Sequence, residues 1–126
     1  MTTNHPFQWE PSDRALSIEV IPQPAGVLVR LHGSATMERC DELTARLADA
    51  AQGRPALIVL DLGDLDFICS LGLGSIVAVY LRAMKHGGRV VVSRPAQAIR
   101  EMLELTRLNH LLTVYDTPEA ALAGRA

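Results

Sequence analysis

A serine set among small residues is the side chain most suited to chemistry in this sequence of 126 residues. Ser70 follows Cys69 and precedes Leu71, Gly72 and one further glycine. A hydroxyl just before a helix can accept a hydrogen bond from an unpaired backbone N–H group, so Ser70 is predicted to be the N-cap of the next helix. A phosphate on the same oxygen would be stabilised by these N–H groups and by the helix dipole. Ser70 is therefore a candidate switch, and a purely structural cap is the alternative.

The two glycines after Ser70 weaken the helix in which they lie. Gly72 and Gly74 each cost up to about 1 kcal/mol relative to alanine in a helix. We expect a phosphate or a partner chain to approach the backbone closely there. The alternative is that the missing side chains permit tight packing inside the domain.

Three aspartates precede the serine and could form a second reactive site. Carboxylates at Asp61, Asp64 and Asp66 could hold Mg²⁺ for phosphoryl transfer. No nucleophile or base accompanies them, and solvated or turn-forming aspartates are the preferred interpretation. The sequence also lacks a phosphate loop, and Val77 stands where a dinucleotide-binding motif needs a third glycine. We therefore predict a protein that is not an enzyme and needs no cofactor.

The cysteines and histidines do not form a metal-binding pattern. Cys40 and Cys69 are the only cysteines and lie far apart in the sequence, which indicates free thiols in a reducing compartment. A reactive thiol at Cys69 is an alternative to a buried small residue, and we assign it no redox chemistry. No metal-ligand spacing relates the four histidines, so no metal site is predicted; they are His5, His32, His86 and His110.

Charge and hydropathy exclude two classes of partner. A net charge of −2, a pI near 6.0 and an aromatic content of 4% argue against nucleic-acid binding. No apolar run approaches the roughly 20 residues that span a bilayer, and the first residues do not resemble a secretory signal. The sequence predicts a cytoplasmic protein without membrane insertion.

Hydrophobic periodicity predicts an α/β domain at 15–126 behind an extended arm at 1–14, which contains Trp9. Alternation at 16–21 and 27–31 predicts a β-hairpin, and helical spacing predicts an amphipathic helix at 37–51 and a largely buried one at 71–86. Further strands are expected at 56–60, 90–92 and 111–115, a helix with Pro95 in its first turn, and a last helix capped by Thr117.

This order predicts a mostly parallel β-sheet with an N-terminal hairpin, covered by about four α-helices. Sites in such sheets lie beyond the carboxyl ends of the strands. Residues 61–74 leave the central strand at that place, so the segment around Ser70 is predicted to carry the function.

The same segment resembles a STAS domain, the fold of bacterial anti-sigma-factor antagonists and of the cytoplasmic tails of sulfate transporters. The motifs that carry the resemblance are Leu60-Asp61-Leu62, Leu65-Asp66-Phe67-Ile68, Ser70, Gly72-Leu73-Gly74 and Gly87-Gly88. The resemblance covers 16–122 and implies a STAS-like α/β fold.

For function, the resemblance implies an anti-sigma-factor antagonist that works by phosphorylation-controlled partner switching. Its partner would be an anti-sigma factor that is also a serine kinase of the ATPase type, and binding would release a sigma factor. Ser70 would be the phosphorylated residue, and a phosphatase would be a further partner. The implied partner-binding residues are Thr36, Ile68, Cys69, Ser70, Leu71, Gly72, Leu73 and Gly74.

Three positions depart from the family pattern. Cys69 replaces an aspartate before the serine, Leu71 replaces a second serine, and Thr36 replaces an acidic residue after the second strand. Negative charge around Ser70 is thereby removed, which alters the electrostatics of phosphorylation. A scaffold or transport-accessory subunit, which would bind its partner without phosphorylation, stays open as the alternative.

Overall fold

The computed structural model describes residues 11–124, which fold around one five-stranded sheet. The strands lie in chain order from β1 to β5; their bounds are β1 Ser17–Gln23, β2 Gly26–Ala35, β3 Leu57–Ile68, β4 Arg89–Ser93 and β5 Val114–Tyr115. The helices are α1 Cys40–Ala51, α2 Ser70–Met84, α3 Gln97–Leu105 and α4 Pro118–Ala123, with 3₁₀ turns at Met37–Arg39 and Leu108–His110. Residues 1–10, including Trp9 of the predicted arm, lie outside the described residues.

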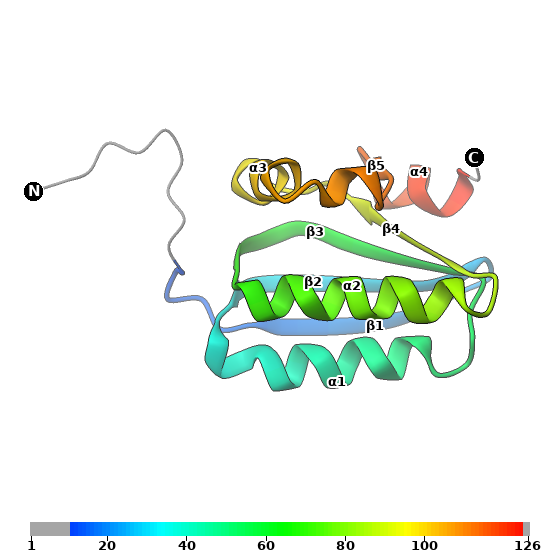
Figure 1. The fold of residues 1–126 in the computed structure, drawn as a ribbon, viewed down its shortest axis with the longest axis horizontal. Helices are drawn as coiled ribbons and strands as arrows, with labels where there is room; N and C mark the ends of the chain where they lie inside the picture. Colours follow the sequence, from blue (N-terminus) through cyan, green and yellow to red (C-terminus); the bar gives the residue numbers. More distant parts are fainter. Residues whose placement is uncertain (1–10, 125–126) are drawn as a thin grey trace, which may run out of the picture.

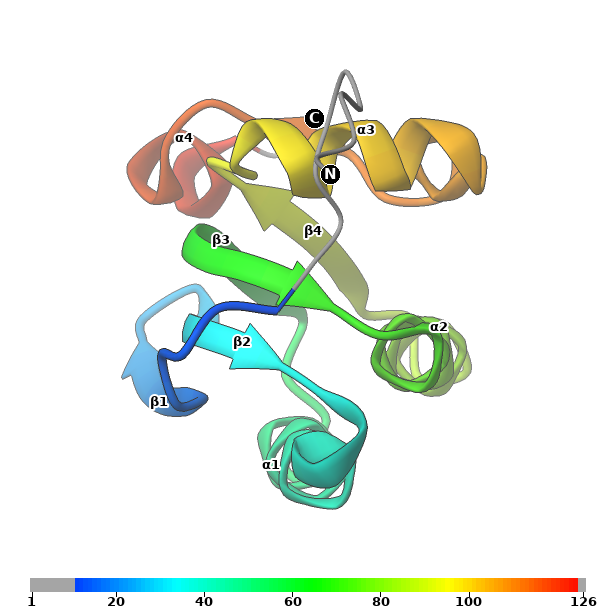
Figure 2. The ribbon, with the colours of Figure 1, turned by 90° about the vertical axis from the view of Figure 1, so that its left-hand side faces the viewer.

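The sheet combines one antiparallel pair with parallel neighbours. β1 and β2 form the predicted hairpin, and each later strand pairs in parallel with the one before it. Figure 2 shows α1 and α2 on one face of the twisted sheet and α4 on the other. A large apolar cluster joins the sheet to α1, α2 and α3, and a smaller one joins it to α4 through Ala121.

β3 is longer than the apolar run at 56–60 predicted. It continues through the three aspartates to Ile68, because β2 supplies pairing partners as far as Ala35. Two register shifts in this pairing accommodate the break in hydrophobic alternation near Gly63. The aspartates therefore belong to a strand and not to a loop.

The helix after Ser70 buries only one of its faces. Leu73, Ile76 and Val79 are buried against the sheet and α1, whereas Leu81 and Met84 are more than half exposed. The prediction of a largely buried helix was wrong in this respect, because α1 and the sheet meet α2 from one side only (Figure 1).

The C-terminal third differs from its predicted boundaries. β5 is only two residues long, since 108–110 forms a 3₁₀ turn before it. Pro95 precedes α3, whose N-cap is Ala96, so it does not lie in the first helical turn. The cap of α4 is confirmed: Oγ1 of Thr117 accepts a hydrogen bond from the backbone N–H of Ala120 at 3.0 Å.

Candidate functional site

Ser70 lies where the central strand β3 passes into α2, at the carboxyl edge of the sheet. Figure 2 shows the passage from β3 into α2. β3 ends at Ile68, and one residue, Cys69, separates it from α2. Ser70 is the first residue of α2 and is exposed. Backbone N–H groups of a first helical turn have no partner within the helix. An anion on the Ser70 oxygen would therefore lie beside unpaired donors and the positive end of the α2 dipole.

The prediction that Ser70 is the N-cap was wrong, because Cys69 occupies that position. Cys69 has the extended backbone conformation of a cap, with φ −78° and ψ 170°, and its Sγ accepts a hydrogen bond from the N–H of Gly72 at 3.4 Å. The carbonyl of Cys69 accepts from the N–H of Leu73 at 3.0 Å, which closes the first turn. The Ser70 hydroxyl is thus not required as a cap.

The predicted partner-binding residues divide into two groups. Ser70, Leu71 and Gly74 are exposed and Thr36 is half-buried. The other predicted residues are buried in the domain beneath the exposed ones; they are Ile68, Cys69, Gly72 and Leu73. Met37, which sequence reasoning missed, is 63% exposed, and Leu71 is 57% exposed.

The two glycines of the first turns have different roles. A Cβ atom added to Gly72 would lie 2.6 Å from Cγ1 of Ile68, so Gly72 permits tight packing inside the domain. A Cβ atom added to Gly74 would meet nothing within 4 Å. Packing therefore explains why position 72 is glycine. At Gly74 no side chain covers the exposed backbone of α2.

The two cysteines, which are distant in the sequence, are neighbours in the fold. Their Sγ atoms lie 2.8 Å apart, and both side chains are buried. Burial, followed by the contact with Cys69, raises the pKa of Cys40 to about 11. The available signal was topological: Cys40 follows β2 and Cys69 follows β3, and adjacent parallel strands end at the same edge.

Asp61 is enclosed by arginines and is not solvated, contrary to our interpretation of the sequence. Only 1% of its surface is exposed. Its carboxylate accepts hydrogen bonds from Arg94 at 2.9 and 3.1 Å, from Arg30 at 3.2 Å and from the N–H of Gly63 at 3.2 Å. Burial alone would raise the pKa of Asp61, but the hydrogen bonds and charge of Arg94, with Gly63 and Arg30, hold it below its usual value.

The other two aspartates also have protein partners. Asp64 is exposed and lies 3.2 Å from Nδ1 of His32. Asp66 accepts hydrogen bonds from Ser12 at 2.8 Å and Ser34 at 3.1 Å and pairs with Arg14 at 3.3 Å. Residues 12–14 are thereby held against the ends of β2 and β3.

Within residues 11–124, no group of three or more histidine, cysteine or acidic side chains is placed to hold a metal ion. Across the same residues, every helix is too short or too polar to span a bilayer.

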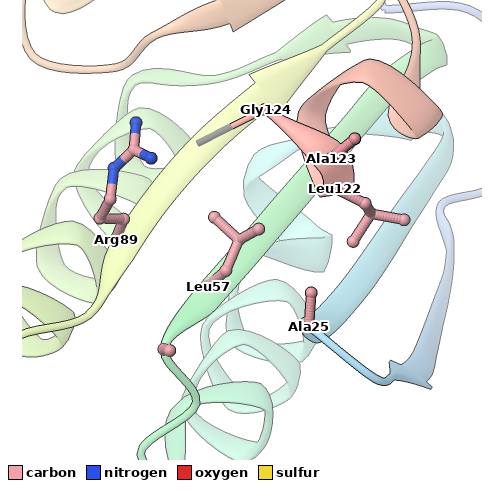
Figure 3. Close-up of a pocket in the computed structure, with 7 residues that line it drawn as sticks. Ala25, Leu57, Arg89, Leu122, Ala123 and Gly124 are labelled. Carbon is pink, nitrogen blue, oxygen red and sulfur yellow. The ribbon is translucent and has the colours of Figure 1, made fainter. Parts of the chain in front are cut away.

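A hollow of the described surface lies away from Ser70. A shallow pocket of about 440 Å³ is bordered by Leu57 at the start of β3, Leu122 of α4 and Arg89 of β4 (Figure 3). Ser70 lies beyond the other end of β3. The candidate site is an exposed edge of the sheet, which suits a macromolecular partner better than a small substrate.

A family model described as "Mlab, STAS domain" matches residues 20–113. The chain belongs to the STAS domain family. An anti-sigma F factor antagonist of Paenibacillus polymyxa is 30% identical to this STAS domain over 108 residues, which are 85% of this chain and 92% of the relative. The STAS domain thus belongs with the anti-sigma factor antagonists, which are regulators and not enzymes, as the sequence predicted.

Solved structures confirm the predicted STAS fold. An anti-sigma factor antagonist from Mycobacterium paratuberculosis matches with a TM-score of 0.78 and 24% identity, covering 90% of this chain and 96% of its own. SpoIIAA in its unphosphorylated form matches with a TM-score of 0.72 and 20% identity, covering 86% of this chain and 93% of its own. The five-stranded mixed sheet with its N-terminal hairpin is therefore the STAS architecture.

Proposed function

We propose that this STAS domain acts by phosphorylation-controlled partner switching. In its unmodified form it binds an anti-sigma factor that is also a serine kinase of the ATPase type, so that a sigma factor is released. Phosphorylation of Ser70 by that kinase ends the binding, and a phosphatase restores it. The observation that carries this proposal is that Ser70, the first residue of α2, is exposed in a member of the antagonist family.

The residues around Ser70 form a surface suited to a protein partner. We define the Ser70 surface as Thr36, Met37, Ser70, Leu71 and Gly74, which lie where β2 and β3 pass into their helices. Its two large side chains, Met37 and Leu71, are apolar and mostly exposed. Apolar side chains gathered beside a polar group are typical of the centre of a protein interface.

A phosphate on Ser70 would favour the free protein over the complex. It adds about −1.5 to −2 charges at neutral pH. In the free domain these charges lie at the N-terminus of α2 and remain hydrated, whereas a bound partner would remove their water. A difference of only about 3 kcal/mol between the two states weakens binding more than a hundredfold.

The solved relatives support a phosphate on this fold. SpoIIAA is known in an unphosphorylated form and in a phosphorylated form, and the latter matches this chain with a TM-score of 0.66. The first turn of α2 here is closed by contacts of Cys69, Gly72 and Leu73. A modified Ser70 would leave these contacts intact.

A non-phosphorylated scaffold or transport-accessory subunit is the second candidate. It is favoured by the residues that replace the family's polar groups around the serine, namely Thr36, Cys69 and Leu71. In that role the Ser70 surface would bind its partner constitutively, through Met37 and Leu71.

The two candidates are separated by incubating the protein with its cognate kinase and ATP. We expect mass spectrometry to find phosphate on Ser70 and none on the Ser70→Ala protein. Ser75→Ala is the matched control, since Ser75 lies on the same helix but its hydroxyl is hydrogen-bonded to Thr44 and to the carbonyl of Leu71.

Calorimetry then measures partner affinity. We expect phosphorylated protein and Ser70→Asp to bind at least tenfold more weakly than unmodified protein, and Ser70→Ala to stay competent for binding. Equal affinity of the phosphorylated and unmodified forms would instead support the scaffold.

A further inference from the structure

The buried thiol pair lies immediately next to the Ser70 surface. The Sγ atoms of Cys40 and Cys69 are 2.8 Å apart although 29 positions separate the two residues. Cys40 is the first residue of α1, and Cys69 is the N-cap of α2. The pair therefore lies between the starting points of two helices, α1 and α2, on the same face of the sheet (Figure 2).

The sulfur atoms are placed for a covalent bond. A disulfide has a sulfur–sulfur distance of about 2.05 Å, so the two atoms need to approach by less than about 1 Å. Each sulfur is also held by a neighbour: Cys40 Sγ lies 3.4 Å from the carbonyl oxygen of Thr36, and Cys69 Sγ accepts from the N–H of Gly72. Little rearrangement of either side chain is required.

We propose that Cys40 and Cys69 form a reversible disulfide when the protein meets a hydroperoxide, and that this modification alters the first turn of α2. The thiolate of Cys69 attacks one peroxide oxygen, the O–O bond breaks, and a sulfenic acid and hydroxide result. Cys40 then attacks the sulfenic sulfur, the hydroxyl group leaves with the Cys40 proton as water, and the S–S bond forms. In sum, two thiols and one hydrogen peroxide yield one disulfide and two waters.

The surroundings of the two sulfurs assign these roles. Cys69 Sγ accepts a hydrogen bond from a backbone N–H, whereas Cys40 Sγ donates one to the carbonyl of Thr36 at 3.4 Å, so Cys69 is the sulfur that attacks first. Burial raises the pKa of Cys40 to about 11, so this thiol keeps its proton until the second step. The deep placement of both sulfurs also restricts further oxidation to small oxidants.

The disulfide would change the cap of α2. Sγ of Cys69 is the acceptor for Gly72, and drawing this atom closer to Cys40 by up to about 1 Å lengthens that hydrogen bond. Ser70 directly follows Cys69, so a shift of the Cys69 cap would alter the backbone position of Ser70. An effect on partner binding rests on the proposed function, whereas formation of the disulfide does not.

The test uses the full chain, reduced and then freed of reductant, and titrated with hydrogen peroxide under native conditions. We expect intact mass to fall by two hydrogen atoms, a cross-linked peptide containing Cys40 and Cys69, and recovery of both thiols with dithiothreitol. The thermal midpoint of the oxidised protein should rise by several degrees, since the bond closes a loop in the unfolded chain. Amide hydrogen exchange should change at 70–74.

Cys40→Ser is the matched control, because it keeps Cys69 and its place at the N-cap. It should gain an oxygen atom on Cys69 or remain unmodified, without losing hydrogen atoms. The proposal is overturned if the wild-type protein gains oxygen instead of losing hydrogen, if no reaction occurs, or if exchange at 70–74 is unchanged in the oxidised form.

A separate assay keeps this proposal distinct from partner switching. Kinase incubation of the reduced protein tests Ser70 alone, and peroxide treatment without kinase tests the thiol pair alone. A disulfide without phosphorylation would refute only the proposed function, and phosphorylation without a disulfide would refute only the present proposal.

Discussion

Residues 61–70, which run from the middle of β3 to the start of α2, have polar side chains at both ends, and these two side chains differ in burial. At one end Asp61 is buried, and its two carboxylate oxygens are occupied by Arg30, Arg94 and the backbone of Gly63. At the other end Ser70 is exposed beside apolar side chains. A polar group whose partners all come from its own chain stabilises the fold, whereas one left at the surface among apolar residues is available to another molecule.

The largest effect is expected beneath the Ser70 surface. Ile76 is 1% exposed on the inner face of α2, so Ile76→Asp would place an unpaired charge in the core and destabilise the protein by roughly 4 kcal/mol. Leu81→Asp is the control, since Leu81 lies on the outer face of the same helix. This variant should lose less than about 1 kcal/mol of unfolding free energy. Urea denaturation measures both, and similar losses would contradict the assignment of inner and outer faces.

The next effect concerns the enclosed end of the comparison. Asp61→Ala leaves Arg30 and Arg94 without their shared carboxylate and should destabilise by about 2 kcal/mol, because charge-assisted hydrogen bonds are lost and water replaces them only in part at the half-exposed arginines. Asp64→Ala removes an exposed carboxylate of the same strand and should change stability by no more than about 0.5 kcal/mol. If the two variants unfold at the same urea concentration, Asp61 is not the structural aspartate.

A pH series sharpens this result. The pKa of Asp61 is lower in the folded protein than in the unfolded chain, so the unfolded state binds the proton more readily. The stabilisation is therefore present above the unfolded pKa, near 3.9, and is lost as pH falls through the folded pKa. The stability difference between wild type and Asp61→Asn should shrink as pH falls below about 4. A difference that stays constant down to pH 2 would show that ionised Asp61 does not contribute.

The smallest effect separates the cap from the hydroxyl beside it. Cys69→Ala removes the acceptor for the Gly72 N–H and some buried volume, and should cost about 1 to 2 kcal/mol. Ser70→Ala should change stability by no more than about 0.5 kcal/mol, although it removes the hydroxyl that we propose is phosphorylated. Thermal unfolding compares the two variants. If Ser70→Ala loses more stability than Cys69→Ala, the N-cap of α2 is Ser70 and not Cys69.

Much of the fold could be predicted because hydrophobic periodicity reports which face of an element is covered. The hairpin, α1 and the cap of α4 follow from alternation, helical spacing and Thr117-Pro118. The extension of β3 could not be predicted, because a charged residue such as Asp61 after an apolar run indicates the end of a buried strand. Only the arginine partners of Asp61 explain how it is buried within the strand. These partners come from β2 and from the residue after β4, so only the folded sheet brings them together.

The structure places Ser70 at the carboxyl edge of the sheet, as the order of elements predicted, but the surroundings of Ser70 depend on contacts between residues that are distant in the sequence. Serine is a better N-cap than cysteine by local preference, yet β3 continues to Ile68 and Gly72 packs against that residue, which starts the helix at Ser70. The thiol pair required knowing that β2 and β3 are neighbours. Exposure of Met37 could not be inferred, since its spacing fits the buried face of α1.

The hold of Ser12 and Arg14 on Asp66 governs how this protein should be displayed on a biosensor. These contacts bring the start of the described chain to the edge where Ser70 lies, whereas Gly124 ends α4 beside Leu57 at the opposite edge. A bulky group attached directly before Ser12 would crowd the Ser70 surface and weaken the measured binding. Attachment at Gly124 leaves that surface facing the solution.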